Sequence, residues 1–321
     1  MERSELLRLL LGREFVSGEE IGQALGVTRA AVSKAVAGLK KEGYLIASVP
    51  NRGYRLDALP DALTQEQVLL HLHEHPWAAS TTVYPVIDST NDHLKRLAAQ
   101  GAPHGTVAVA DCQTGGRGRT GRSFDSKGGS GIYLSVLLRP HCRPDRLMTL
   151  TAQTAVAVRR AILAVTGAET QIKWVNDLVL GGRKLCGILT ELSIEAESGL
   201  VSYAVVGIGV NCNRPVEDFP PELQAVAGSI LSQTGTWVDR SRLAAQMIRE
   251  LSSLPELDWR EEYRAACVNL GREVRILGAE TRCGTAVDVG AQAELIVRLE
   301  GGELVSVNAG EVSVRGLYGY V

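Results

Sequence analysis

The chain has 321 residues, of which 45% are apolar and 22% charged. This composition is typical of globular proteins and excludes an intrinsically disordered or collagen-like chain, and the length predicts about two or three domains. The 34 Lys and Arg residues are balanced by 36 Asp and Glu residues, which excludes a uniformly basic nucleic-acid-binding protein and leaves room only for a local basic surface.

Neither a membrane-spanning segment nor a secretory signal is evident. The sequence has no run of about 18 apolar residues, and its first five residues lack the cationic start of a signal peptide. The six cysteines are widely separated, which favours reduced thiols over a disulfide framework or a zinc site. We therefore expect a cytoplasmic protein with no membrane partner and no metal held by the protein itself.

A first segment, residues 1–60, differs in charge from the remainder. Residues 29–55 contain six Lys or Arg residues and only one acidic residue, so a basic face is concentrated there. Residues 57–63 have the composition of a linker, after which Thr64 and Gln67 have the spacing of a helix capping box. These features predict a domain boundary near residue 60.

The pattern within residues 17–40 predicts a helix-turn-helix. Ile21 and Leu25 lie on one face of a first helix, and Gly26 supplies the turn residue. Two further runs, Tyr44–Val49 and Tyr54–Leu56, have the pattern of a two-stranded wing. Residues expected to face DNA are short or basic, as a helix in the major groove requires: Thr28, Arg29, Ala30, Ser33 and Lys34 on the second helix, and Arg52 at the wing tip. A unit this small needs two copies on two half-sites to bind an operator tightly, so we expect a dimer on DNA.

Residues 64–270 mix apolar strand-like runs with amphipathic helices, which predicts a central α/β domain. Arg146–Val165 is apolar on nearly all sides and should form a buried helix. The expected strands are Thr82–Ile87, Thr106–Asp111, Ile132–Leu138, Ile172–Trp174, Lys184–Leu192 and Val201–Val210. Residues 271–321 have short alternating runs separated by glycine, the pattern of a small β-barrel or sandwich: Glu273–Leu277, Ala286–Val289, Ala293–Leu299, Glu303–Val307 and Glu311–Arg315.

Residues 115–122, Gly-Gly-Arg-Gly-Arg-Thr-Gly-Arg, form the most distinctive motif. Gly116, Gly118 and Gly121 match the spacing of dinucleotide-binding loops, but such loops lead directly into a helix. Here three more glycines precede the strand expected at Ile132, so we exclude that interpretation. The remaining feature is a flexible loop with four cations suited to carboxylate or phosphate: Arg117, Arg119, Arg122 and Lys127.

Three further segments place polar side chains at the ends of apolar strands. Residues 88–91 follow one strand and precede a helix, residues 173–177 end another strand, and Lys184 begins an otherwise apolar one. Polar groups at strand ends with apolar residues behind them are typical of a ligand cleft in an α/β domain.

Together these segments resemble the biotin–protein ligase family. The resemblance is carried by Ser89-Thr90-Asn91, Gln113 through Arg122, Lys173-Trp174-x-Asn176-Asp177, Arg183-Lys184-x-x-Gly187-Ile188-Leu189 and Gly207-Ile208-Gly209-Val210-Asn211. Because it also includes the helix-turn-helix, the chain is similar to the bifunctional bacterial form, a biotin ligase and biotin operon repressor. The implied fold is α+β multidomain: a winged helix-turn-helix at 1–60, a class II aminoacyl-tRNA synthetase-like biotin ligase domain at 64–270, and an SH3-like β-barrel at 271–321.

The resemblance implies a two-step reaction. Biotin and ATP with Mg²⁺ give biotinyl-5′-AMP and pyrophosphate, and the biotinyl group then passes to a lysine of the biotin carboxyl carrier protein of acetyl-CoA carboxylase. Because the substrate carboxylate is the nucleophile, the enzyme needs cations and positioning rather than a catalytic Ser, Cys or His. Biotinyl-AMP is also the expected corepressor, which would favour a homodimer and hence binding to operator DNA.

The resemblance also implies roles for single residues. The expected biotin site consists of Ser89, Thr90, Asn91, Gln113, Arg117, Gly118, Arg119 and Lys184. The expected ATP site consists of Arg119, Arg122, Lys173, Asn176 and Asn211, with Mg²⁺ brought by ATP. Lys184 and Arg119 are the expected catalytic cations, and Asp177 is the hypothetical proton acceptor for the incoming lysine. Residues 213–236 should order over the adenine, with Phe219, Leu223 and Ile230 as candidate covers.

Three other interpretations stay open. A ligand-sensing repressor without catalysis would need the helix-turn-helix and a pocket, but neither Lys184 nor the arginine-containing loop. A lipoate ligase would share the central fold but seldom carries a DNA-binding domain. A biotin ligase whose N-terminal domain has lost its operator would keep catalysis alone. Release of pyrophosphate distinguishes a biotin ligase from the ligand-sensing repressor, and competition between biotin and lipoate distinguishes it from a lipoate ligase.

Overall fold

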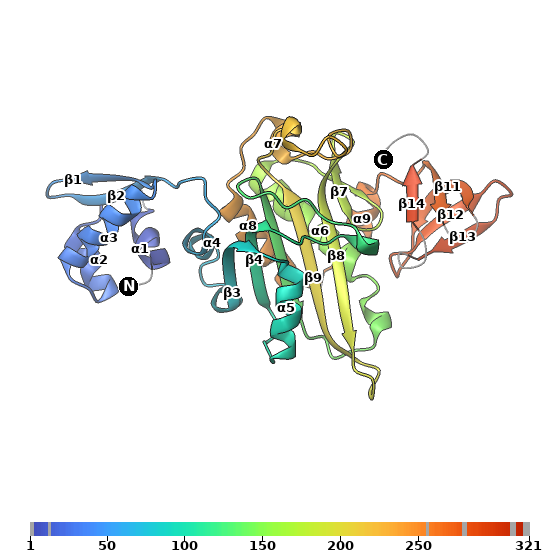
Figure 1. Ribbon diagram of the computed structural model, residues 1–321, viewed down its shortest axis with the longest axis horizontal. Helices are drawn as coiled ribbons and strands as arrows, with labels where there is room; N and C mark the ends of the chain where they lie inside the picture. The colour runs from blue at the N-terminus through green and yellow to red at the C-terminus, as the bar shows by residue number, and fades with distance from the viewer. Residues whose placement is uncertain (1–2, 12–13, 255–256, 278–280, 309–312, 317–321) are drawn as a thin grey trace.

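The computed structural model describes residues 3–11, 14–254, 257–277, 281–308 and 313–316. Three units follow one another along the long axis of the molecule, with the helix-turn-helix at one end and a small sheet at the other (Figure 1). Among the described residues, no helix combines the length and the apolar character needed to cross a membrane. The six cysteines are free thiols.

The N-terminal unit confirms the predicted helix-turn-helix and wing. It consists of α1 (Arg3–Leu10), α2 (Gly18–Leu25), α3 (Arg29–Lys41), β1 (Leu45–Val49) and β2 (Gly53–Ala58). Gly26 ends α2 in the left-handed conformation at φ 64°, which glycine adopts without strain. Thr28 caps α3 by accepting the Ala31 N–H at 3.2 Å. A Cβ at Gly22 would lie 2.7 Å from the carbonyl oxygen of Val27, so this glycine permits the tight turn between the two helices.

A mixed seven-stranded sheet forms the centre of the molecule. Its strands are β3 (Thr81–Ile87), β4 (Thr106–Gln113), β5 (Gly131–Leu138), β6 (Gln171–Lys173), β7 (Asp177–Leu180), β8 (Arg183–Ile194) and β9 (Val201–Asn211), in the order β3-β4-β5-β9-β8-β7-β6. Only β3 and β4 are parallel, and their last residues, Ile87 and Gln113, are paired. Six of these strands were predicted. The seventh, β7, was not predicted.

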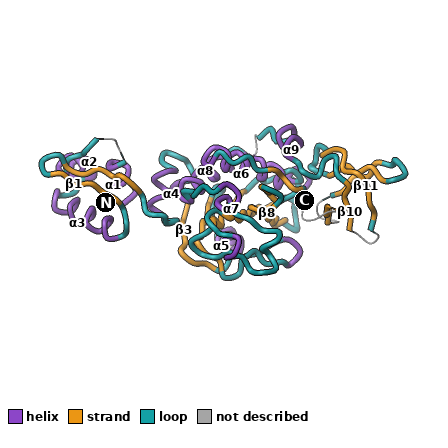
Figure 2. The backbone as a smooth tube through the Cα atoms, turned by 90° about the horizontal axis from the view of Figure 1, so that it is seen from above, coloured by secondary structure: helices purple, strands orange, loops and turns teal. Residues whose placement is uncertain are grey.

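Helices cover both faces of this sheet. They are α4 (Gln65–His71), α5 (Thr90–Ala99), α6 (Leu150–Thr166), α7 (Ile230–Thr234), α8 (Arg240–Ser252) and α9 (Arg260–Ala266). Figure 2 shows α6 and α8 on one side of the sheet and α5 on the other. The predicted buried helix is α6, although it begins only at Leu150, after a short 3-10 turn at Pro144–Leu147. Helix α4 joins two cores, since Leu70 packs in the N-terminal core and Val68 in the central one.

The C-terminal unit is a five-stranded antiparallel sheet. It consists of β10 (Glu273–Leu277), β11 (Arg282–Val289), β12 (Leu295–Leu299), β13 (Leu304–Val307) and β14 (Ser313–Gly316), in the order β13-β12-β11-β10-β14. In the described part of the chain no pairing joins β13 to β14, so the sheet is open where a closed barrel was expected. The predicted strand at 311–315 corresponds to β14, with residues 311 and 312 outside the described residues.

Candidate functional site

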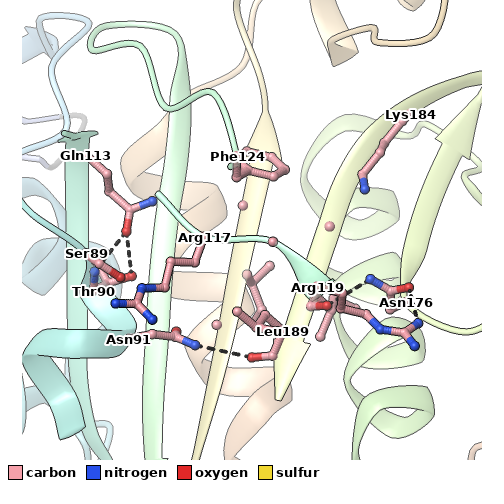
Figure 3. A pocket seen from close by; sticks show the side chains of 16 residues that line it. Ser89, Thr90, Asn91, Gln113, Arg117, Arg119, Phe124, Asn176, Lys184 and Leu189 are labelled. Atoms are coloured by element: carbon pink, nitrogen blue, oxygen red, sulfur yellow. Dashed lines mark hydrogen bonds between the residues drawn. The ribbon is translucent and has the colours of Figure 1, made fainter. Parts of the chain in front are cut away.

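A cavity opens where the glycine-rich loop crosses the ends of the central strands (Figure 3). The residues that line it come from the start of α5, β4, the loop, the turn between β6 and β7, β8 and β9: Ser89, Thr90, Asn91, Gln113, Arg117, Gly118, Arg119, Phe124, Asn176, Lys184, Gly187, Ile188, Leu189, Gly207, Ile208 and Gly209. All eight residues predicted to bind biotin are among them. The loop leads into β5 rather than into a long helix, which confirms that its glycine pattern is not a dinucleotide-binding motif.

One end of the cavity is lined by short neutral polar side chains together with Arg117, whose guanidinium lies beside Thr90 and Asn91 in Figure 3 and pairs with the Asp92 carboxylate at 2.8 Å. Because β3 and β4 are parallel, the start of α5 lies beside the end of β4, and Gln113 reaches Thr90. The Gln113 Oε1 accepts the Thr90 N–H at 2.8 Å and lies 3.1 Å from the Thr90 hydroxyl. The Gln113 amide nitrogen donates to the Ser126 hydroxyl at 3.0 Å. Ser89 caps α5 by accepting the Asp92 N–H at 3.4 Å. The fold therefore fixes these short side chains before any ligand arrives.

Asn91 lies at the same end, with only 4% of its surface exposed. A Cβ at Gly207 would lie 2.0 Å from the Asn91 Oδ1, so only glycine leaves room for this amide against β9. The Asn91 Nδ2 donates to a carboxylate oxygen of Glu191 at 2.7 Å, and its Oδ1 lies 2.6 Å from the hydroxyl of the fully buried Ser135.

The other end of the cavity is cationic. The Lys184 Nζ lies 2.6 Å from the Asp177 Oδ1, and the Arg119 Nη1 donates to the Asn176 Oδ1 at 3.1 Å. Asn176 is itself held because its Nδ2 donates to the Ile188 carbonyl at 3.0 Å. Figure 3 shows Lys184, Arg119 and Asn176 across the cavity from Gln113. This end suits a carboxylate or phosphate group, because the planar guanidinium of arginine and the compact ammonium of lysine both bind such anions.

Phe124 lies between the two ends and was missed by the sequence interpretation. A Cβ at Gly209 would lie 2.6 Å from the Phe124 ring, and one at Gly187 would lie 3.2 Å from both that ring and the Lys184 Nζ. These two glycines leave room for the Phe124 ring against β8 and β9 and form the floor of the cavity there. The available signal was that Phe124 is the single aromatic residue between Gly115 and Ser130.

Fewer of the predicted ATP-site residues than of the predicted biotin-site residues line the cavity. Only Arg119 and Asn176 of the five residues line the cavity. Arg122 is exposed on the loop, Lys173 is buried at the end of β6, and the Asn211 Nδ2 donates to the Gly228 carbonyl at 3.0 Å. Their contacts with ATP stay predictions.

The segment expected to cover the adenine lies beside the cationic end. The Lys184 N–H donates to the Val226 carbonyl at 2.8 Å, and the Gly228 N–H donates to the Lys184 carbonyl at 2.9 Å. Of the candidate covers, Ile230 is fully buried in the central core, and Phe219 is 3% exposed with the Arg214 guanidinium 4.2 Å above its ring. None of the three candidates lines the cavity.

The DNA-facing residues predicted on α3 and the wing are all exposed: Thr28, Arg29, Ala30, Ser33, Lys34 and Arg52. One aromatic residue beside them was missed. The guanidinium groups of Arg52 and Arg55 lie 4.8 Å and 4.7 Å from the centre of the Phe15 ring. Stacking on this ring orders two cations beside the wing.

Comparison with known proteins agrees with this arrangement. Residues 83–211 match the biotin/lipoate A/B protein ligase family, residues 2–55 an HTH domain, and residues 270–315 the biotin protein ligase C terminal domain. The chain is 32% identical to the bifunctional ligase/repressor BirA of Escherichia coli (strain K12), over 97% of this chain and 96% of that protein. It is 40% identical to the protein of the same name from Bacillus spizizenii, over 74% of each chain.

Among solved structures, the biotin protein ligase of Aquifex aeolicus in complex with biotin and ATP is similar, with a TM-score of 0.62 and 28% identity over 74% of this chain and 98% of that one. A ligase domain with a polar, cation-ended cavity behind a helix-turn-helix defines a DNA-binding ligase. The chain belongs to the bifunctional ligase/repressor family of biotin protein ligases.

Proposed function

We propose that this protein is an ATP-dependent biotin–[acetyl-CoA-carboxylase] ligase that also represses the biotin operon. The observation that carries the proposal is the cavity itself, in which the neutral cluster around Gln113 faces Lys184 and Arg119. A cyclic urea has one carbonyl and two N–H groups, so the polar end suits it. The cationic end suits the valeryl carboxylate and the phosphates of ATP.

In the first step, a carboxylate oxygen of biotin attacks the α-phosphorus of ATP. The bond between the α-phosphorus and its bridging oxygen breaks, and pyrophosphate leaves. Both reactants are anionic, so Lys184 and Arg119 lower the barrier by offsetting charge as it develops. Mg²⁺ enters with ATP and neutralises phosphate charge. Among the described residues, no group of three or more His, Cys, Asp or Glu side chains could hold a metal ion.

In the second step, the ε-amine of the carrier protein's lysine attacks the acyl carbon of biotinyl-AMP, and AMP leaves. The amine loses a proton, and Asp177 is the proposed acceptor. Its carboxylate also pairs with Lys184 at 2.6 Å, which supports a second role in aiming that ammonium group into the cavity. When the Lys184 ammonium contacts the acyl phosphate, this carboxylate becomes available for the proton.

The repressor activity uses the N-terminal unit. The exposed basic residues of α3 and the wing support operator binding, and a homodimer formed on biotinyl-AMP would place two such units on two half-sites. In this proposal the chain comprises a DNA-binding unit at 1–60, a catalytic unit with the class II synthetase-like fold at 64–270, and a C-terminal unit related to SH3-like barrels at 271–321. The mixed seven-stranded sheet and the five-stranded sheet support the last two assignments.

The decisive measurement of ligase activity is pyrophosphate release from the purified protein with Mg-ATP, with and without biotin, before any carrier is added. We expect a biotin-dependent burst of about one equivalent per chain, because the adenylate stays bound. Absence of release would exclude the ligase and leave a ligand-sensing repressor. Lipoate added in place of biotin serves as the matched control, and a burst with lipoate alone would reassign the substrate.

The repressor proposal needs its own test. Binding to a biotin-operon operator fragment should require biotin together with ATP, and it should be accompanied by dimerisation in analytical ultracentrifugation. Arg52→Ala should weaken that binding and, because both protomers of the dimer lose the contact, reduce its salt dependence by about two ions, without changing pyrophosphate release. Equal binding with and without biotin would contradict the corepressor role and leave a ligase that has lost its regulation.

A further inference from the structure

A buried arginine that the proposed reaction does not use lies beside the cavity. Arg214 is 3% exposed and belongs to a strap, residues 213–229, that runs between β9 and α7. The strap is bonded to the cationic end, because the Lys184 N–H donates to the Val226 carbonyl and the Gly228 N–H donates to the Lys184 carbonyl. A charged side chain that is buried in this way needs a charged partner.

The partner comes from a wall segment, residues 124–127, at the end of the glycine-rich loop. The Arg214 Nη1 lies 2.7 Å from the Asp125 Oδ2, and that oxygen is shielded from solvent. The remaining contacts of the guanidinium lie within the strap, since it stacks 4.2 Å above the Phe219 ring and its Nη2 donates to the Asp218 carbonyl at 2.8 Å. Asp125 is therefore the contact that joins Arg214 to the loop.

The side chains of the wall segment alternate between the cavity and the strap. Phe124 lines the cavity (Figure 3), and the Ser126 hydroxyl accepts a hydrogen bond from the Gln113 Nε2 at 3.0 Å. Asp125 and Lys127 instead form ion pairs with residues of the strap. The strap thus contacts the outer side of a segment whose inner side borders the cavity.

These contacts connect the two ends of the cavity from outside, from Lys184 through the strap to Asp125 and Phe124. We propose that Arg214 is a positioning residue that ties the wall segment to the strap, so that both keep one arrangement around biotinyl-AMP and retain it. The inference rests on the proposed function, because biotinyl-AMP is the ligand that joins a ureido ring at one end to a phosphate at the other.

Two ion pairs join the wall segment to the strap, and they differ in burial. The Arg214 side chain is 4% exposed, whereas the side chains of Lys127 and Asp218, which pair at 2.8 Å, are 49% and 46% exposed. Loss of one partner from a buried pair leaves a charge without compensation, whereas an exposed pair contributes little. The pair of Arg214 with Asp125 should therefore form the effective connection.

The same chemical change in the two pairs tests this difference. Asp125→Asn keeps the shape of the side chain and removes the charge that Arg214 needs. We expect it to raise the biotin KM and the ATP KM together, each roughly tenfold, and to speed dissociation of biotinyl-AMP roughly 10- to 100-fold, measured by chase with unlabelled biotin. Asp218→Asn, the matched control in the exposed pair, should change each value by less than about twofold.

Two further readouts separate positioning from a general loss of structure. The rate of the pyrophosphate burst at saturating biotin and ATP should stay within about threefold of the wild-type rate, because Lys184 and Arg119 are unchanged. The melting temperature of Asp125→Asn should stay close to that of Asp218→Asn. A residue that acted at one end of the cavity alone would raise only one of the two KM values.

Arg214→Met tests whether the two residues act as one unit. It keeps an apolar contact with Phe219, and by itself it should raise both KM values as Asp125→Asn does. In the Asp125→Asn background, where the pair is already broken, it should raise the biotin KM by less than about a further twofold. Independent roles predict that the two single effects multiply.

The outcomes distinguish this inference from the proposed function. Biotin-dependent pyrophosphate release by the wild type overturns the role of Arg214 alone if Asp125→Asn raises only one KM value, matches Asp218→Asn, or multiplies with Arg214→Met. A wild-type protein that neither binds biotin nor releases pyrophosphate with it overturns the proposed function as well. If Arg214→Met does not fold, Asp125→Asn and its control still decide the question, because the Asp125 side chain is 36% exposed and tolerates an amide.

Discussion

The two ends of the ligand cavity are held by different interactions. At the neutral end, side chains bond to one another: Gln113 to Thr90, and Asn91 to Ser135 and Glu191. At the cationic end, Lys184 is paired with Asp177, a carboxylate that substrate anions must replace. The difference teaches that recognition of a neutral ring is built into the fold, whereas neutralisation of charge depends on exchange of ionic partners.

The largest predicted effect tests the cationic end. Two unit charges about 4 Å apart at an effective dielectric near 20 interact by roughly 4 kcal/mol. Lys184→Ala should therefore slow biotinyl-AMP formation by up to about a thousandfold, measured as the pyrophosphate burst under saturating ATP. The Kd for biotin should change far less, because the ureido end is intact. Lys40→Ala in α3 provides the control, and turnover of Lys184→Ala at the wild-type rate would contradict the assigned role.

The next prediction concerns the floor that both ends share. A methyl group at Gly209 would lie 2.6 Å from the Phe124 ring, so Gly209→Ala should push the ring into the cavity and raise the biotin KM by roughly 100-fold. Phe124→Leu in the same chain should recover part of the loss by removing the clash. Gly301→Ala, where the methyl group meets open space, is the matched control. Failure of Phe124→Leu to improve Gly209→Ala would show that the damage lies elsewhere.

The sequence predicts residues of both ends, but it indicates how the side chains meet only at the neutral end. The neutral end was found because its residues are adjacent in the chain: Ser89, Thr90 and Asn91 begin one helix, and Gln113 ends the neighbouring parallel strand. The arrangement of the cationic end depends on the directions in which the side chains on and beside β7 point. The pairing of β7 with β8 shifts register between Leu178 and Val179, which changes those directions. No local pattern predicts such a shift.

Polar residues inside apolar strands escaped the sequence interpretation for another reason. Ser135 and Glu191 have no distinctive neighbours, and a serine or glutamate in a strand ordinarily faces solvent or completes a hydrogen bond to the backbone. Their role depends on contact with Asn91, which is 44 residues from Ser135 and 100 residues from Glu191 in the chain. Tertiary structure alone brings them together. The positions of the strands, by contrast, could be predicted, because the core requires runs of apolar residues.

A smaller effect should separate the two ends by substrate. Gln113→Ala removes the acceptor of the Thr90 N–H and should raise the biotin KM about tenfold, with the ATP KM unchanged. Asn176→Ala removes the acceptor for Arg119 and should raise the ATP KM about tenfold, with the biotin KM unchanged. Titration of each substrate against saturating amounts of the other measures both values. If each variant raised both KM values equally, the cavity would not have two independent ends.

The smallest predicted effect uses pH and concerns the neutral end alone. His93 on α5 contacts the Tyr84 hydroxyl of β3 at 2.8 Å, and burial, together with the charge of Arg96, lowers its pKa below the ordinary value of 6.5. A lowered pKa means that the folded state resists protonation, so the contribution of His93 to stability is complete above pH 6.5 and is lost as the pH falls through the lower folded value.

His93→Gln cannot titrate. Between pH 7 and 5 the wild type should therefore lose a few tenths of a kcal/mol more stability than this variant, after allowance for solvent screening, as followed by thermal melts. The other histidines are present in both proteins and cancel from the difference. Because α5 carries Thr90 and Asn91, the biotin Kd of the wild type should weaken over the same pH range while its ATP KM stays constant. If the biotin Kd and the ATP KM both rose over this pH range, acid would be acting on the whole domain rather than on α5.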